Sequence, residues 1–593
     1  MQDNTVYDPL KNFKNIYKDL HNENTINYFD ELVEKSNINI DENQTTVKKI
    51  NNLKNNRTNI DKKLSGQKSL KIFLIVVTIL SLVMSIISIA NFQNNITLNV
   101  FLLILGILLS IGMLLLIFKK INPKIKSLKQ EINELDKKIE ENIQLAFSQV
   151  KPLNDLFYEG MSETLFSKTL PIFNLDPIFD SKRLDYLVNK FGLYNEIDPD
   201  RSSLYVKSGD INGNPFYIAN DLVHNLGTKI YTGSLTITYT TYVTVNGKRT
   251  AQVHTQLLTA SLERPCPYYR EEAYLIYGNE AAPNLNFSRT DSDAEHLTQK
   301  QIDKLVKKDS KSLIKKTQKS ISKNGSYTMM SNEEFEVLWG ASNRDNEVEF
   351  RLLFTPLAIK QLLELMKDKE VGFGDNFGFI KANMINGVFP DHLKGFDLSG
   401  NPNIFYHYDY ELIRSRFINY NNAYFKNVYF AFAPLLSIPL YQHQKPREFI
   451  YKDLYDSYAS FYEHEKVANK MNIEEFKHPL SNTRNILKTS VVKSGGFADT
   501  VKVTAYGYQT ENKVDYIPRV GKDGRTHLVP VYWVLYTPVT QDTSIKINIV
   551  DEPKEETYRD KFMKRVEKLK TGENLDPVDL YLFRSFIVEV LKK

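Results

Sequence analysis

The fold is decided by two apolar stretches, IFLIVVTILSLVMSIISIA at residues 72–90 and VFLLILGILLSIGMLLLIF at residues 100–118. Each has 19 uncharged residues. At about 1.5 Å per residue, a helix of that length crosses a hydrocarbon core of about 30 Å. Thirteen residues of the first stretch and fifteen of the second are Ile, Leu, Val or Phe. Because such helices are apolar on all sides, which favours lipid over a protein core, we predict a transmembrane hairpin at residues 70–118.

Basic residues flank the hairpin on both sides. Those before it are Lys54, Arg57, Lys62, Lys63, Lys68 and Lys71, and those after it are Lys119, Lys120, Lys124, Lys126 and Lys129. The loop from Asn91 to Asn99 has no charged residue. Since basic flanks stay in the cytoplasm, we predict a cell-membrane protein with two spans and both termini cytoplasmic.

Small residues occur within both apolar stretches: Ser81, Ser85 and Ser88 in the first, Gly106 and Ser110 in the second. They would let the two backbones approach closely. The alternative is that they are ordinary lipid-compatible residues. Because neither span has an ionisable residue, we expect no ion or proton path through this hairpin alone.

Narrow apolar seams precede and follow the hairpin. The residues are Val47, Ile50, Leu53, Ile60 and Leu64 before it, and Ile125, Leu128, Ile132, Leu135 and Ile139 after it. This spacing of three and four residues predicts two helices that pair as an antiparallel coiled-coil stalk. A structural spacer and a homo-oligomer formed through the same seams are both compatible with the pattern.

The remaining chain alternates apolar and polar residues in two regions. Residues 229–245, Asn246-Gly247 and residues 248–262 form the pattern of a long β-hairpin. Residues 501–549 repeat it around Asp523-Gly524. We therefore predict an α+β protein whose cytoplasmic body contains antiparallel sheets covered by helices.

A chain of 593 residues is too long for one core. The predicted regions are N-terminal cytoplasmic helices at 1–69, the transmembrane hairpin at 70–118, a helical stalk at 119–150, a first α+β region at 151–290, a lysine-rich insertion at 291–330, a second α+β region at 331–440, a C-terminal extension with a β-hairpin at 441–550 and C-terminal helices at 551–593. The last of these helices is predicted from Asp576-Pro577, with an apolar face of Leu580, Phe583, Ile587, Val590 and Leu591.

The insertion is the most basic part of the chain. Its nine lysines are Lys300, Lys304, Lys307, Lys308, Lys311, Lys315, Lys316, Lys319 and Lys323. A solvated helix or linker explains this pattern, and contact with an anionic membrane surface is the sharper hypothesis. Nucleic acid is the weakest of the three hypotheses, because the net charge of the chain is only +5 and no aromatic residue interrupts the lysines.

Two segments carry a family resemblance. Residues 335–337 and 347–356 are expected to form a strand, a loop and a strand entering a helix at Leu357–Met366, followed by a glycine-rich turn and an apolar run at 377–385. With residues 204–219, this order resembles an uncharacterised bacterial family of membrane proteins that have two N-terminal transmembrane helices and a cytoplasmic domain of unknown function. The chain departs from that family by its lysine-rich insertion and by its extension from about Tyr441, which look like versions in wall-less, AT-rich bacteria. The resemblance implies the architecture and no activity.

Motifs for catalysis, cofactors and metals are absent from the sequence. Residues 372–378 lack the lysine and hydroxyl residue of a phosphate loop and are expected to form a hairpin turn. Glu463-His464-Glu465 is expected on a solvated helix surface, and His407 with Asp409 on one face of a strand at 405–410 would need a further metal ligand. The single cysteine, Cys266, excludes an internal disulfide and is expected to be packed.

These observations favour binding over catalysis. We predict a membrane-anchored cytoplasmic scaffold or adaptor with the lipid bilayer and a protein as partners. The alternatives are a membrane-bound enzyme acting on lipid or envelope precursors and an accessory subunit of a transporter or secretion complex.

Overall fold

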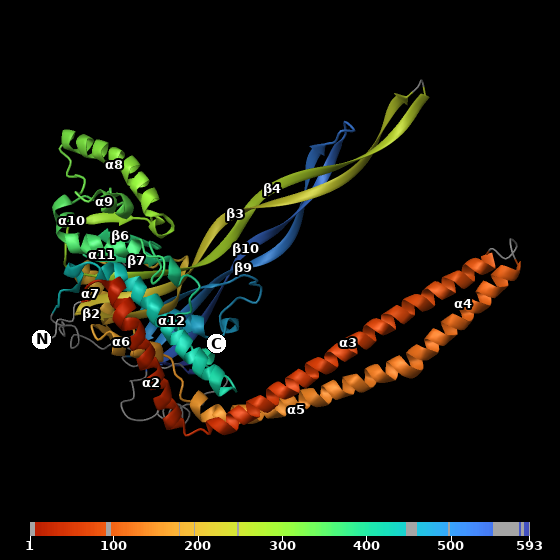
Figure 1. The fold of residues 1–593 in the computed structure, drawn as a ribbon. Coiled ribbons are helices and arrows are strands. Elements are labelled where there is room, and N and C mark those ends of the chain that lie inside the picture. Colours follow the sequence, from red (N-terminus) through yellow and green to blue (C-terminus); the bar gives the residue numbers. More distant parts are fainter. Residues whose placement is uncertain are drawn as a thin grey trace. The chain divides into compact units, whose positions relative to one another are not determined.

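The structure is a computed structural model that describes residues 6–90, 96–176, 178–194, 196–245, 248–445, 459–495, 498–549, 580–582 and 586–591. It is mixed α+β, with long N-terminal helices and antiparallel sheets (Figure 1). The chain divides into two compact units. We call residues 27–157 with 402–419 the helical unit, and residues 1–26, 158–401 and 420–593 the α+β unit.

The helical unit contains three long helices. They are α3 (Ile40–Ala90), α4 (Ile96–Leu116) and α5 (Asn122–Asn154), with a π-helical turn at Ile117–Ile121. Leu64 of α3 packs against Leu128 and Ile132 of α5, and Arg57 Nε lies 3.1 Å from Asp136 Oδ1. The two predicted seams therefore face each other in one helix pair, which Figure 1 shows in red and orange.

Small residues bring α3 and α4 together. A side chain on Gly106 would place its Cβ 2.9 Å from the backbone oxygen of Ser81. The hydroxyls of Ser81 and Ser110 lie 2.6 Å apart. The two backbones therefore approach closely at these small residues, which is the first of the two alternatives that the sequence left open.

The apolar stretches of these helices expose many large apolar side chains. Exposed side chains include those of Ile72, Phe73, Ile86, Leu108 and Phe118. By length and composition, the two helices over Ile40–Ile89 and Val100–Asn154 could each cross a membrane.

The α+β unit has two antiparallel sheets. Its helices are α1 (Pro9–Asn12), α6 (Met161–Thr169), α7 (Ser181–Phe191), α8 (Gln299–Ser322), α9 (Glu333–Trp339), α10 (Glu347–Leu353), α11 (Pro356–Met366) and α13 (Phe461–Lys470), while the unit boundaries fall within α2 (Lys18–Ser36) and α12 (Tyr410–Leu436). Its strands are β1 (Phe173–Leu175), β2 (Arg201–Ile211), β3 (Asn214–Val245), β4 (Lys248–Gly278), β5 (Asn286–Arg289), β6 (Phe377–Ala382), β7 (Ile385–Pro390), β8 (Ile486–Ser494), β9 (Ala498–Val520), β10 (Thr526–Ile549), β11 (Leu580–Leu582) and β12 (Phe586–Leu591). The described strands form a seven-stranded sheet in the order β1-β2-β3-β4-β7-β6-β5 and a five-stranded sheet in the order β11-β12-β10-β9-β8.

Both predicted hairpins are confirmed. Strands β3 and β4 pair continuously from Phe216↔Tyr277 to Val245↔Lys248, and Figure 1 shows them as one long twisted ribbon. The Asn246-Gly247 turn lies outside the described residues. Strands β9 and β10 make the second ribbon, with Gly524 at a φ of 77° in its turn, where a glycine has no steric penalty.

The second ribbon packs, near its turn, against the outer half of the first ribbon. Ile237, Leu258 and Ala260 of the first ribbon share a buried cluster with Val529 and Val531 of the second. This packing covers part of each ribbon and gives the pair a core of its own.

The core of the α+β unit is rich in aromatic residues. Phe432 of α12 contacts Phe173 and Phe216, with ring centroids 4.9 and 4.8 Å away. Trp339 and Phe354 of the α9–α11 region pack 5.1 Å apart. The C-terminal half of α12 is thereby held in the core that supports the seven-stranded sheet.

Two expected strands are helices. Residues 335–337 lie in α9 and residues 347–353 form α10. The side chains of Asn332 and Asn346 accept hydrogen bonds from the backbone N–H groups of Phe335 and Glu349, which caps both helices. The prediction missed these caps and relied on the apolar residues alone, whereas the helix expected at Leu357–Met366 is confirmed as α11.

The prediction of a C-terminal helix from Asp576-Pro577 is also wrong for the residues of this segment that the structure describes. Residues 580–582 and 586–591 are strands β11 and β12. Phe586, Val588 and Val590 are buried at alternate positions, which is the period of a strand, and β12 pairs with β10. The part of the predicted C-terminal helices at 551–579 lies outside the described residues.

Candidate functional site

The lysine-rich insertion forms helix α8. Thr298 and Gln301 make a capping box at its start, while Ile302 and Ser310 are buried. All nine lysines of the proposed membrane-contact surface are exposed. Lys316 also contacts the body, because its amine donates to the carbonyl oxygen of Ser342. The structure therefore places eight of these lysines on one helix and Lys323 at its C-cap, and Ile302, Leu305 and Val306 of this helix pack on the core.

The expectation of a solvated Glu463-His464-Glu465 surface is wrong. These side chains are only 0%, 1% and 2% exposed, because α13 lies against both β2 and β8. Adjacent residues on a helix point in different directions. On α13 each of these directions is covered by protein, so all three side chains are buried.

Each buried side chain of this segment has a polar partner. Glu463 lies 2.6 Å from the amine of Lys466. Glu465 lies 2.6 Å from the amine of Lys488 and accepts the backbone N–H of Ser203.

His464 belongs to the same buried segment. Its Nε2 lies 3.2 Å from Asp499 Oδ2. Asp499 also accepts a hydrogen bond from the Ser494 hydroxyl. This arrangement fixes α13 between the two sheets.

Burial governs the protonation of Glu465. It raises the pKa of this carboxyl to about 7, although the nearby Lys488 amine opposes the shift. A carboxyl with such a pKa suits general acid–base chemistry. Because the group is buried in the packed interior, the geometry favours a structural and pH-sensitive role over contact with a substrate.

The other sequence candidates also have structural surroundings. Residues 405–410 are a turn leading into α12, where the Asp409 N–H donates to His407 Nδ1. Residues 372–376 connect α11 to β6 and do not form the expected hairpin turn. Cys266 is buried, as predicted. Among the described residues, no group of three His, Cys, Asp or Glu side chains is placed to hold a metal ion.

The loop before β6 contains a buried ion pair. Asp375 accepts from Arg289 Nη2 at 2.7 Å, and both side chains are 0% exposed. The guanidinium carbon of Arg289 lies 4.6 Å from the Trp339 ring centroid. This charged pair therefore holds the loop to the core.

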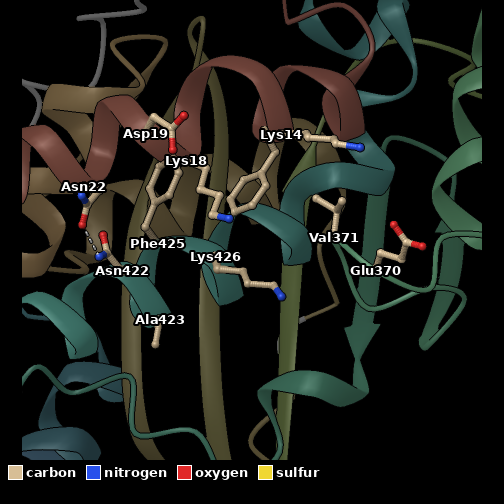
Figure 2. A pocket seen from close by; sticks show the side chains of 11 residues that line it. Lys14, Lys18, Asp19, Asn22, Glu370, Val371, Asn422, Ala423, Phe425 and Lys426 are labelled. Atoms are coloured by element: carbon tan, nitrogen blue, oxygen red, sulfur yellow. Dashed lines mark hydrogen bonds between the residues drawn. The ribbon is translucent and has the colours of Figure 1, made fainter.

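A pocket of about 510 Å³ lies in the α+β unit (Figure 2). Its walls come from the start of α2 and the turn before it, from the loop after α11 and from α12. The lining residues are Phe13, Lys14, Lys18, Asp19, Asn22, Glu370, Val371, Asn422, Ala423, Phe425 and Lys426. Segments distant in the sequence therefore assemble one cavity of a size typical for small-molecule sites.

Positive charge and apolar surface meet in this pocket. Figure 2 shows Lys18 extending from α2 and Lys426 extending from α12. Burial lowers the pKa of Lys426; the Asp368 carboxylate opposes this shift, and the Lys18 ammonium adds to it. The Asn422 amide donates to Asn22 Oδ1 at 2.7 Å, which ties α12 to α2.

Sequence reasoning missed this pocket because Lys18 and Lys426 belong to helices that are 408 residues apart in the chain. Their local spacing, as in Lys14 and Lys18, is an ordinary exposed-helix pattern. Comparisons of the chain with protein-family models, curated proteins and solved structures found no match.

Proposed function

We propose that the protein is a membrane-anchored cytoplasmic scaffold or adaptor, with two transmembrane spans, a coiled-coil stalk and a body that binds a protein partner through its long β-ribbon. The two apolar helices support the anchor, since lipid is the environment that suits their exposed Ile, Leu and Phe side chains. The lysines on both flanks support cytoplasmic termini.

The β3–β4 ribbon is the observation that carries the binding role. Beyond the cluster containing Ile237 and Leu258, its strands continue for several more pairs toward Val245↔Lys248. Tyr242 and Val253 in this outer part are 62% and 68% exposed. A two-stranded hairpin is marginally stable alone. Its length and apolar exposure are therefore better explained by docking than by folding of the body.

The carboxyl group with the strongly raised pKa favours the same conclusion. Glu465 is buried beside Lys488 and does not line the described pocket. An acid or base that acts on a substrate must reach the reacting atoms. Binding is therefore the simpler role for the body.

Proximity labelling from a C-terminal tag in the native cell tests the proposal. In one variant, residues 238–255 are replaced by Asn-Gly, which joins the paired residues Ile237 and Gln256 by a two-residue turn. A second variant, Tyr242→Ser with Val253→Ser, keeps the ribbon length. We expect both to lose a defined set of neighbours that the unaltered protein labels.

The matched control changes two other exposed apolar residues, Val348→Ser with Leu352→Ser on α10. This control should keep the full set of neighbours. An unchanged set in both ribbon variants would refute the proposed docking role. A further variant replaces the two spans by an unrelated transmembrane hairpin. Neighbours lost only in that variant would instead favour an accessory subunit of a membrane complex.

A further inference from the structure

The pocket on the α+β unit has three cationic side chains. Lys14 and Lys18 belong to the N-terminal turn and α2, and Lys426 belongs to α12. Among the described residues none of the three has an ion-pair partner, whereas many other lysines of this unit do, such as Lys367 with Glu334 at 2.7 Å. The Lys18 and Lys426 ammonium groups repel each other, and an anion placed between them would relieve that repulsion.

An aromatic contact helps to position the Lys426 side chain. Its amine lies 4.8 Å from the ring centroid of Phe373, and that ring stacks on His392 with centroids 4.1 Å apart. A cation held over an aromatic face is attracted to the ring, and this contact orders its stem. The amine is therefore positioned before any ligand arrives.

The rest of the lining suits the body of an organic molecule. Phe13, Phe425 and Val371 provide apolar surface. Asp19 and Glu370 line the same pocket and, like the lysines, have no described ion-pair partner. Carboxylates accept hydrogen bonds from hydroxyl or amine groups. The pocket therefore combines an anion-binding part, an apolar part and acceptors for polar hydrogens.

We propose that this pocket binds a small organic phosphate, with the phosphate between Lys18 and Lys426 and hydroxyl or amine groups of the ligand toward Asp19 and Glu370. Lysine is a point-charge donor that commonly binds phosphate. The volume of about 510 Å³ accommodates a ligand of nucleotide or sugar-phosphate size. A phospholipid headgroup offers the same phosphate chemistry, so the experiment must separate soluble from lipid sources.

Thermal unfolding of the full chain in detergent, monitored by tryptophan fluorescence, tests the proposal. The probes are ATP, ribose 5-phosphate, glycerol 3-phosphate, inorganic pyrophosphate and dihexanoyl phosphatidic acid, with adenosine and ribose as uncharged controls. A ligand that binds only the folded state raises the melting temperature. We expect at least one organic phosphate to do so and the uncharged compounds to have no effect. Stabilisation by phosphatidic acid alone would identify the lipid source, and stabilisation by a soluble ester would identify a metabolite.

Paired variants locate the binding. Lys18→Gln with Lys426→Gln should weaken affinity for the stabilising probe, measured by calorimetry, by about tenfold to a hundredfold, since charged hydrogen bonds are lost. The matched control, Lys493→Gln with Lys522→Gln, removes the same charge at two exposed lysines outside the pocket and should bind normally. Single Lys18→Gln and Lys426→Gln variants provide the measurement if the double variant does not fold. No stabilisation by any phosphate, or an equal loss in the control, would overturn the proposal.

Discussion

The substitution Glu465→Gln should remove a specific pH dependence of stability. Burial raises the pKa of this carboxyl from 4.5 to about 7. In the range between these values the folded protein binds a proton that the unfolded chain has lost. The contribution of this proton to the free energy of unfolding is fully present below pH 4.5 and is lost as the pH rises through 7. The sign is opposite to that of an ordinary ion-paired carboxylate.

The size of the effect follows from the shift. At about 1.4 kcal/mol per pKa unit, the full contribution is about 3 kcal/mol. Roughly 2 kcal/mol of it falls between pH 5 and pH 7.5. Glutamine resembles the protonated carboxyl and keeps an oxygen for the N–H of Ser203. The variant should therefore lose this part of the pH dependence.

Urea unfolding in detergent, followed by the fluorescence of Trp339 and Trp533, measures the free energy of unfolding at a series of pH values. The comparison is between the unaltered protein and the variant, since other groups titrate in both. Glu131→Gln on the exposed side of α5 is the control. If the free energies of unfolding of the unaltered protein and of Glu465→Gln changed in parallel from pH 5 to pH 7.5, the assignment of Glu465 as the buried titrating group would be refuted.

Three further changes have expected outcomes. Gly106→Ile should separate α3 from α4, because a Cβ at this position meets the backbone of the facing helix. With Gly106 in place, Ser81→Cys and Ser110→Cys should form a disulfide rapidly; Gly106→Ile should abolish it, and unchanged crosslinking would contradict the packing. Asp375→Asn should lower the free energy of unfolding by about 3 kcal/mol or more, because it leaves its arginine partner charged and buried; a urea midpoint within error of the unaltered protein would argue against this. Lys308→Cys should react more slowly with a maleimide in nanodiscs of anionic lipid than of zwitterionic lipid if α8 contacts the membrane surface, and equal rates would exclude that contact.

The two long hairpins and the helix pair could be predicted because their signals are local and repeated. Asn246-Gly247 and Asp523-Gly524 mark turns between alternating runs. The seams around Leu64 and Leu128 recur over several helical turns. Each of these patterns specifies its own structure before any distant contact forms.

The sequence predictions were wrong where contacts between distant parts of the chain determine the structure. The apolar residues of β12 fit a helical face as well as a strand, and pairing with β10 selects the strand. Glu463 and Glu465 look like surface residues in the sequence, yet their cover comes from β2 and β8. The pocket lysines Lys18 and Lys426 are brought together by the fold alone.

Cysteine accessibility in intact cells tests most directly that two spans anchor a cytoplasmic body. In a Cys266→Ala background, one variant carries Asn94→Cys between the two apolar stretches and another carries Lys360→Cys on α11. We predict that a membrane-impermeant maleimide labels Asn94→Cys in intact cells and labels Lys360→Cys only after permeabilisation. Labelling of Lys360→Cys in intact cells, or release of the protein from membranes by alkaline carbonate, would contradict the proposed anchor.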